Sequence, residues 1–203
     1  MRVSYRNPAK ALFKTASLQQ GYFTAKQAIE AGYVVNNHSY HVQMGDWSRE
    51  WRGIYRLNSY PISENGQYAL WSLWSMNRAG IPQGVYSHET ALSFFELSDI
   101  MPSKLHMTVP KTFRRHSKPP KILILHFGEF NHDEIEEGEG YRVAKPLRAC
   151  LDLIISETVS SDIVRQALSQ GKARGLITNS QVKAYLAGNV VADKIKSTLK
   201  EFF

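Results

Sequence analysis

Apolar residues recur every three or four positions through most of the first 45 residues, which is the spacing of helices. Within residues 8–21 this spacing predicts a first helix, with a proline in its first turn and a glycine at its end. Thr24 and Gln27 then have the spacing of a capping box, so a second short helix is expected that stops at Gly32. A third helix is predicted between residues 36 and 45.

The third predicted helix carries a polar face. We expect Val35, Tyr40 and either Val42 or Met44 to point inward, because they follow the apolar spacing. The outward positions would then hold side chains that can donate or accept hydrogen bonds at base edges. These candidate DNA-reading residues are Asn37, His38, Ser39, His41 and Gln43.

Residues 46–57 mix aromatic and basic side chains around Gly53 and predict a two-stranded hairpin. Trp47, Ile54 and Leu57 would pack back on the helices. Three guanidinium groups would remain free to reach phosphates or a narrow minor groove, namely those of Arg49, Arg52 and Arg56. Three helices followed by a strand pair is the order of a winged helix-turn-helix, whose third helix enters the major groove of DNA.

A polar linker that contains proline and glycine follows the hairpin, so we expect a domain boundary near Tyr60. Residues 1–60 would form the winged helix-turn-helix, and residues 61–203 a mixed α/β C-terminal domain. Strands are predicted at 104–110 and 121–127, the second as a central strand because its apolar run is nearly continuous. Helices are expected around them, including one opened by a proline in the sequence PLRACLDLI. The predicted fold class is α+β.

The net charge of +7 is concentrated at one end of the chain. Residues 1–60 hold eight Lys and Arg against three Asp and Glu, whereas residues 131–203 hold ten of each. Such an asymmetry favours a nucleic acid or another anionic surface as the partner of the first part.

No apolar run approaches the length of a membrane span, and the first ten residues lack the apolar stretch of a signal peptide. We therefore expect a cytoplasmic protein without a membrane partner. The single cysteine, Cys150, excludes an intrachain disulfide and lies in an apolar helix pattern, which indicates a packing role.

Other groups of reactive side chains give no catalytic pattern. His88 and Glu89 are adjacent but lack a nucleophile or metal-ligand spacing, so we interpret them as part of a helix cap. The acidic stretch 129–140 has no spacing that fixes its carboxylates on one face, and no metal or cofactor is assigned. The basic segment Lys111–Lys121 either contacts a second phosphate track, RNA or an acidic partner, or is a solvated hairpin loop.

Two alternatives to a non-catalytic DNA-binding protein remain open. The first is a metal-dependent nuclease that a winged helix targets to DNA, with Asp152 and Glu157, or Asp133 and Glu136, as the nearest candidate carboxylates. Neither pair has a convincing lysine partner. The second is a protein-binding module that binds a toxin directly through the C-terminal domain and its basic segment.

Several segments together resemble the AbiEi family of type IV abortive-infection antitoxins. They are GYFTAKQAIEAGY, WRGIYRL, YSHETALSFFELSD, LHMTVP and YRVAKPLRACLDLI, in an order and spacing that extend over most of the chain. The resemblance implies a bacterial repressor that binds repeats in its own promoter through an N-terminal winged helix. It also implies that the C-terminal domain counteracts a nucleotidyltransferase-like toxin without a stable complex. Family members often carry basic residues on the recognition helix, and this segment has only histidines, so more of the affinity is expected from the hairpin.

Overall fold

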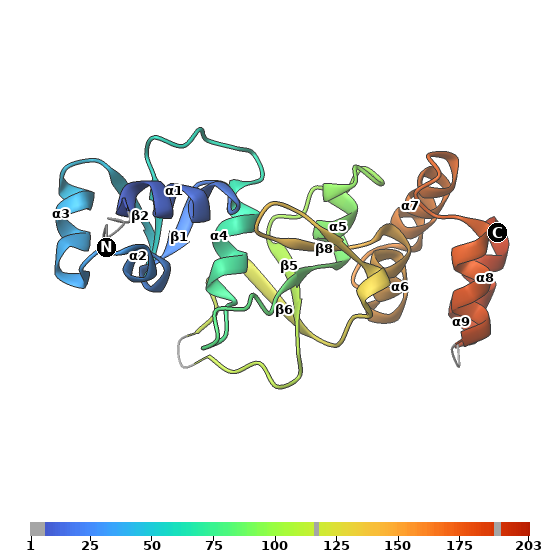
Figure 1. Cartoon of the computed structure of the whole chain (residues 1–203). Coiled ribbons are helices and arrows are strands. Elements are labelled where there is room, and N and C mark those ends of the chain that lie inside the picture. The colour runs from blue at the N-terminus through green and yellow to red at the C-terminus, as the bar shows by residue number, and fades with distance from the viewer. Residues whose placement is uncertain (1–6, 116–117, 189–191) are drawn as a thin grey trace, which may run out of the picture. The chain divides into compact units, whose positions relative to one another are not determined.

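The computed structural model describes residues 7–115, 118–188 and 192–203 (Figure 1). Its described part has mixed α+β architecture with two sheets, so the predicted fold class is confirmed at that level. The chain forms two compact units. The first takes in the described residues up to Gln83 together with Glu137–Tyr141, and the second takes in Gly84–Glu136 and the described residues from Arg142 onward.

The first unit combines helices with a three-stranded antiparallel sheet of order β1-β3-β2. Its elements are α1 (Pro8–Ser17), β1 (Tyr22–Thr24), α2 (Ala25–Ala31), η1 (Val35–Asn37), α3 (His38–Gln43), β2 (Trp47–Trp51), β3 (Ile54–Leu57) and α4 (Gly66–Trp74).

Local capping explains where the first two helices begin and end. The Asn7 side chain accepts hydrogen bonds from two backbone N–H groups of the first turn of α1, and Pro8 occupies the first helical position. The predicted capping box of α2 is confirmed, because Thr24 accepts from the Gln27 N–H and the Gln27 side chain accepts from the Thr24 N–H. Gly32 ends α2 with a φ of 111°, as expected from its position.

The core of the first unit joins the two helices to the sheet. Phe23, Trp47 and Leu57 lie in it beside buried residues of α1 and α2, and Ile54 is also buried. The predicted inward packing of the hairpin is therefore confirmed. The compact unit extends beyond Tyr60, because α4 packs on β1 and β3.

The second unit is built on a five-stranded mixed sheet of order β6-β5-β4-β8-β7. β5 is antiparallel to β4 and parallel to β6, and β4 is parallel to β8. Helix α6 packs against α5, α7 and α9. The elements are β4 (Val85–Tyr86), α5 (His88–Phe94), β5 (Leu105–Val109), β6 (Leu123–Phe127), η2 (His132–Glu134), β7 (Ile135–Glu137), β8 (Arg142–Ala144), α6 (Pro146–Ser156), α7 (Ser161–Ala173), α8 (Asn179–Gly188) and α9 (Asp193–Phe202).

Two predictions about this sheet are wrong. β6 is an edge strand and is only partly buried, whereas all five residues of β5 are buried. Because β5 and β6 run parallel, the basic segment Lys111–Lys121 is a crossover connection and not a hairpin loop. Residues 116–117 of that segment lie outside the described residues.

Helix α6 confirms the prediction of a proline-opened helix with an apolar inward face. Pro146 is its first residue, and Cys150, Leu151 and Ile154 are buried. Burial raises the pKa of the Cys150 thiol to about 12, so the thiol stays protonated. Within the described ranges, every helix is too short or too polar to cross a bilayer.

We predict that Gly21→Ala destabilises the first unit more than Gly45→Ala. Both glycines have positive φ, 83° and 78°, so both substitutions carry a backbone penalty of about 1 kcal/mol. A Cβ at Gly21 would lie 2.7 Å from the Tyr60 ring, whereas no atom of the described residues lies within 4 Å of a Cβ at Gly45. The overpacking should cost Gly21→Ala about 1–3 kcal/mol more.

Urea unfolding followed by tryptophan fluorescence measures this difference. All four tryptophans, at positions 47, 51, 71 and 74, belong to the first unit, so the signal reports that unit alone. Equal loss of stability in the two variants would mean that the contact between Gly21 and Tyr60 does not constrain the fold.

Candidate nucleic-acid interface

Helix α3 is held in place by two histidines that pack as aromatic rings. The ring of His38 lies 5.4 Å from Trp47 and 5.8 Å from Tyr55, both in edge-on geometry. The ring of His41 stacks on Trp47 at 4.7 Å, and its Nδ1 lies 3.0 Å from a carboxylate oxygen of Asp46. Together with the partly buried Val42, these rings form the inward face of α3.

The prediction that His38 and His41 point outward is therefore wrong. His38 is 5% exposed, and its Nε2 is buried without a hydrogen-bond partner in any residue that the structure describes. Burial, and secondarily the neighbouring His41, lowers the pKa of His38, which favours the neutral ring. Histidine was treated as a polar surface residue in the prediction, whereas both rings pack as aromatic groups. The predicted outward face of α3 therefore included two residues that lie inward.

The outward face of α3 and η1 combines amides, a hydroxyl and apolar groups. Asn37, Ser39 and Gln43 are exposed as predicted. Val35 and Tyr40 were predicted to lie inward but are 59% and 55% exposed. Of the two alternatives for the remaining inward position, Val42 is partly buried, as expected, and Met44 is 61% exposed. Asn36 is also exposed. This outer face, hereafter the α3 face, consists of Val35, Asn36, Asn37, Ser39, Tyr40, Gln43 and Met44.

The hairpin β2–β3 presents two of the three predicted arginines to solvent. A register shift between Arg49 and Trp51 bulges β2, and Gly53 turns the chain with a φ of 73°. Arg49 and Arg52 are exposed, and across the described part of the chain neither guanidinium makes a hydrogen bond or an ion pair. They are therefore available to an anionic partner.

Arg56 is not available to a partner in the same way, so the prediction that its guanidinium remains free is wrong. Its side chain is only 14% exposed and lies 3.8 Å from a carboxylate oxygen of Glu50. Its Nη1 donates to the carbonyl oxygens of Leu57 at 3.3 Å and Tyr60 at 2.9 Å. These hydrogen bonds connect the end of β3 to the segment that follows it. Arg56 therefore stabilises the hairpin and does not extend into solvent.

In the second unit, one arginine of the segment Lys111–Lys121 forms hydrogen bonds with the backbone of the same segment. Arg114 donates from Nη1 to the carbonyl oxygens of Lys111 and Phe113, each at 2.8 Å. Lys118 and Lys121 are exposed. Whether this segment contacts nucleic acid stays a prediction.

The second unit also contains a histidine cluster that the sequence did not reveal. The rings of His88 and His126 stack at 3.6 Å with an interplanar angle of 13°, and His106 Nδ1 lies 3.1 Å from His126 Nε2. His106 Nε2 lies 3.7 Å from a carboxylate oxygen of Glu89. Ser87 Oγ links His88 Nδ1, at 2.9 Å, to Thr108 Oγ1, at 2.7 Å. The residues come from α5, β5 and β6, so their separation in sequence conceals the cluster.

The surroundings of the cluster favour the neutral form of its three imidazole rings. Burial, followed by the nearby histidines and Arg148, lowers the pKa of His88 to about 3. Burial and His106 lower the pKa of His126 to about 4, and burial lowers that of His106. His88 also has a φ of 52°, which a non-glycine residue rarely adopts. Protonation would place like charges on stacked rings, so low pH should destabilise this unit.

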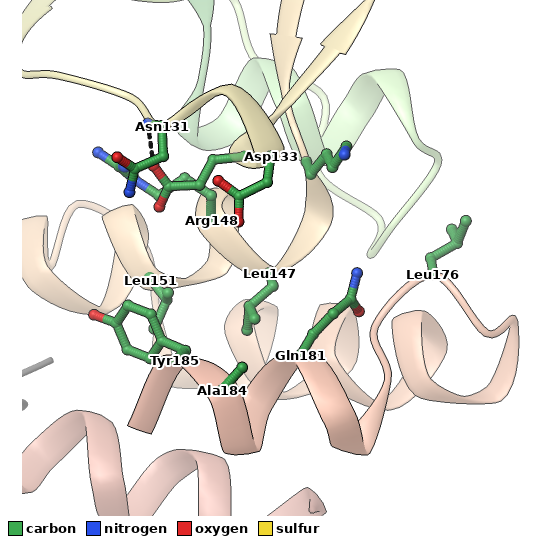
Figure 2. A pocket seen from close by; sticks show the side chains of 11 residues that line it. Asn131, Asp133, Leu147, Arg148, Leu151, Leu176, Gln181, Ala184 and Tyr185 are labelled. Carbon is green, nitrogen blue, oxygen red and sulfur yellow. Dashed lines mark hydrogen bonds and ion pairs between the residues drawn. The ribbon is translucent and has the colours of Figure 1, made fainter. Parts of the chain in front are cut away.

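A cavity of about 280 Å³ lies in the same unit between η2, α6 and α8. Figure 2 shows Ala184 and Tyr185 of α8 facing Leu147 and Leu151 of α6 across it. Arg148 lines the cavity, but its guanidinium already forms three hydrogen bonds. It donates to Asp152 at 2.9 Å, to Glu134 at 2.7 Å and to the Glu129 carbonyl at 3.1 Å. This guanidinium connects the η2 segment to α6, and its hydrogen bonds leave it unavailable to an anionic ligand.

One of the two carboxylate pairs considered for a nuclease is engaged in ion pairs. Asp152 pairs with Arg148, and Glu157 pairs with Lys194. Among the residues that the structure describes, no group of three or more His, Cys, Asp or Glu side chains is arranged to hold a metal ion.

Comparison with known proteins identifies no family. No protein-family model matches the chain, and no curated protein matches its sequence. Among solved structures, the chain is similar to the crystal structure of the RV2827C protein from Mycobacterium tuberculosis. The TM-score is 0.46 with 11% sequence identity, over 80% of this chain and 71% of that chain. The AbiEi resemblance of the sequence therefore stays a prediction.

We predict that His88→Asn makes the stability of the second unit less dependent on pH. The pKa of His88 is lowered in the folded state, so its contribution is complete above the unfolded value near 6.5 and is lost as pH falls toward 3. Asparagine tolerates the positive φ and does not titrate. Between pH 7.5 and 5.5 the wild type should lose about 1 kcal/mol more than the variant, after allowance for solvent screening.

Urea unfolding at both pH values, followed by far-UV circular dichroism, measures this slope. His132→Asn is the matched control, because His132 is exposed on η2. Glu89, His106 and Arg148 face the cluster and are unchanged in both variants. Identical slopes for wild type and His88→Asn would show that the stacked pair does not resist protonation.

Proposed function

We propose that the chain is a DNA-binding transcriptional repressor and that its first unit is a winged helix-turn-helix. The proposal includes the role that the sequence resemblance implies, that of antitoxin in a type IV toxin-antitoxin system. In this role the protein represses its own operon, opposes a nucleotidyltransferase-like toxin, works in the cytoplasm, and needs neither a cofactor nor catalytic chemistry of its own.

One observation carries the DNA-binding proposal. Within a single compact unit, α3 leads directly into the hairpin β2–β3, and both present side chains to solvent. Three helices, a strand between the first two, and a final antiparallel pair with sheet order β1-β3-β2 suit a winged helix. In that arrangement α3 is the helix that enters the major groove.

The two exposed surfaces differ in chemistry, which supports a division of roles. The α3 face carries amides and a hydroxyl, which suit hydrogen bonds to base edges. Arg49 and Arg52 on the hairpin suit phosphate oxygens, because a guanidinium forms forked charge-assisted hydrogen bonds. Phosphate contacts supply affinity and position, and base contacts supply sequence preference.

A binding titration tests the repressor proposal. Purified full-length protein is titrated with the duplex immediately upstream of its own gene and with a scrambled duplex, at two salt concentrations. We expect a preference of about a thousandfold or more for the native duplex. Equal binding to both duplexes would remove sequence-specific repression, and binding to neither would remove the DNA proposal.

We predict that Arg49→Ala and Arg52→Ala weaken binding to both duplexes by similar factors. Each loss of a phosphate contact should reduce the slope of log affinity against log salt by about 1. Arg165→Ala is the control, because Arg165 is an exposed arginine of the second unit. An unchanged salt slope in both hairpin variants would exclude the hairpin from phosphate binding.

The antitoxin role predicts rescue without stable association. Co-expression of the chain with a toxin of the nucleotidyltransferase class that is encoded beside it should restore growth. The untagged toxin should not co-purify with the tagged chain. Stoichiometric co-purification would instead support the alternative of a protein-binding module, and absence of rescue would contradict the antitoxin role.

A further inference from the structure

The α3 face lacks formal charge. Its exposed polar groups are the amides of Asn36, Asn37 and Gln43 and the hydroxyl of Ser39, and its exposed apolar groups are Val35, Tyr40 and Met44. The two histidines of α3 are turned inward against Trp47. The free cations next in the chain, Arg49 and Arg52, belong to the hairpin and not to the helix.

This composition discriminates among the base pairs. Guanine is read most often by arginine or lysine at its N7 and O6 atoms, and the cytosine amino group is read by a carboxylate. The α3 face offers neither kind of side chain. Asparagine and glutamine form paired hydrogen bonds with N6 and N7 of adenine, and apolar side chains pack on the 5-methyl group of thymine. Both of these groups are present.

From this match we infer that α3 reads A·T base pairs, with thymine 5-methyl groups packed against Val35, Tyr40 or Met44. The inference rests on the proposed DNA-binding function and specifies which DNA the site selects. It also accounts for the exposure of Val35, Tyr40 and Met44 on η1, on α3 and at the end of α3, because thymine methyls are the apolar feature of the major groove. The arginines of the hairpin then supply the attraction to phosphate that the α3 face lacks.

Replacing thymine by uracil tests the inference, because it removes the 5-methyl group and keeps the Watson–Crick pairing. The duplex upstream of the gene is prepared by polymerase chain reaction with either dTTP or dUTP, and the full-length protein is titrated with each. Loss of one buried methyl corresponds to about a fourfold loss of affinity. We expect the uracil duplex to bind at least that much more weakly, with the same salt slope.

Protein variants then show whether the methyl groups contact the α3 face. Val35→Ala, Tyr40→Ala and Met44→Ala are each titrated with both duplexes, and at least one should bind the two duplexes equally. Ile62→Ala is the matched control, because Ile62 is an apolar residue of the same unit that is 88% exposed but lies outside α3 and the hairpin. It should preserve the wild-type preference for thymine.

The outcomes separate this inference from the proposed function. Specific binding with equal affinity for thymine and uracil duplexes overturns the inference and leaves the repressor proposal standing. A thymine preference that none of the three variants alters also overturns it, because the methyl groups would then act through DNA shape. Absence of specific binding overturns the proposed function and the inference together. Self-association that Tyr40→Ala or Met44→Ala abolishes would assign the α3 face to a second copy of the chain instead.

Discussion

The indole of Trp47 fixes the orientation of α3, and the candidate interface depends on it. The side chain is 2% exposed and contacts rings from β1, from the segment after α2, from α3 and from β3. Each such aromatic pair contributes about 0.5–1.5 kcal/mol beyond the burial of area. The paired ring centroids lie between 4.7 and 5.9 Å apart across this cluster, which comprises Phe23, Tyr33, His38, His41, Trp47 and Tyr55. Trp47, with Tyr55 beside it, thus holds the two histidines of α3 on its inward side.

This packing separates two kinds of chemistry that the sequence places only a few residues apart. His38 and His41 are drawn inward, so the α3 face retains amides and apolar groups without a cation. The bulge in β2 and the turn at Gly53 leave Arg49 and Arg52 in solvent. In our proposal, base selection therefore belongs to α3 and salt-dependent affinity to the hairpin. Arg56 serves the fold, because its guanidinium donates to backbone carbonyls at the end of β3 and just after it.

Features encoded by local chemistry could be predicted from the sequence. The capping box at Thr24, the turn at Gly32 and the inward Trp47 are confirmed, because each depends on neighbouring residues or on strong apolar character. The face of α3 could not be predicted, since histidine serves equally well as a polar surface residue and as a packed ring. The histidine cluster of the second unit joins residues up to 38 positions apart, from His88 to His126, and depends on parallel pairing of β5 with β6. Edge position has no local signature either, which is why the apolar run of β6 misled the prediction.

The most direct measurement of the central claim is a methyl NMR titration of the full-length protein, labelled at its methionine ε-methyl groups, with the duplex upstream of its gene. Met44 lies on the α3 face, Met107 is buried in β5, and Met101 is 93% exposed in the second unit. Met44→Ala identifies the first resonance. If the α3 face binds DNA, the Met44 resonance shifts on addition of the duplex, while those of Met101 and Met107 stay in place. A shift at Met101 with an unchanged Met44 would contradict the account, because DNA would then bind the second unit and not α3.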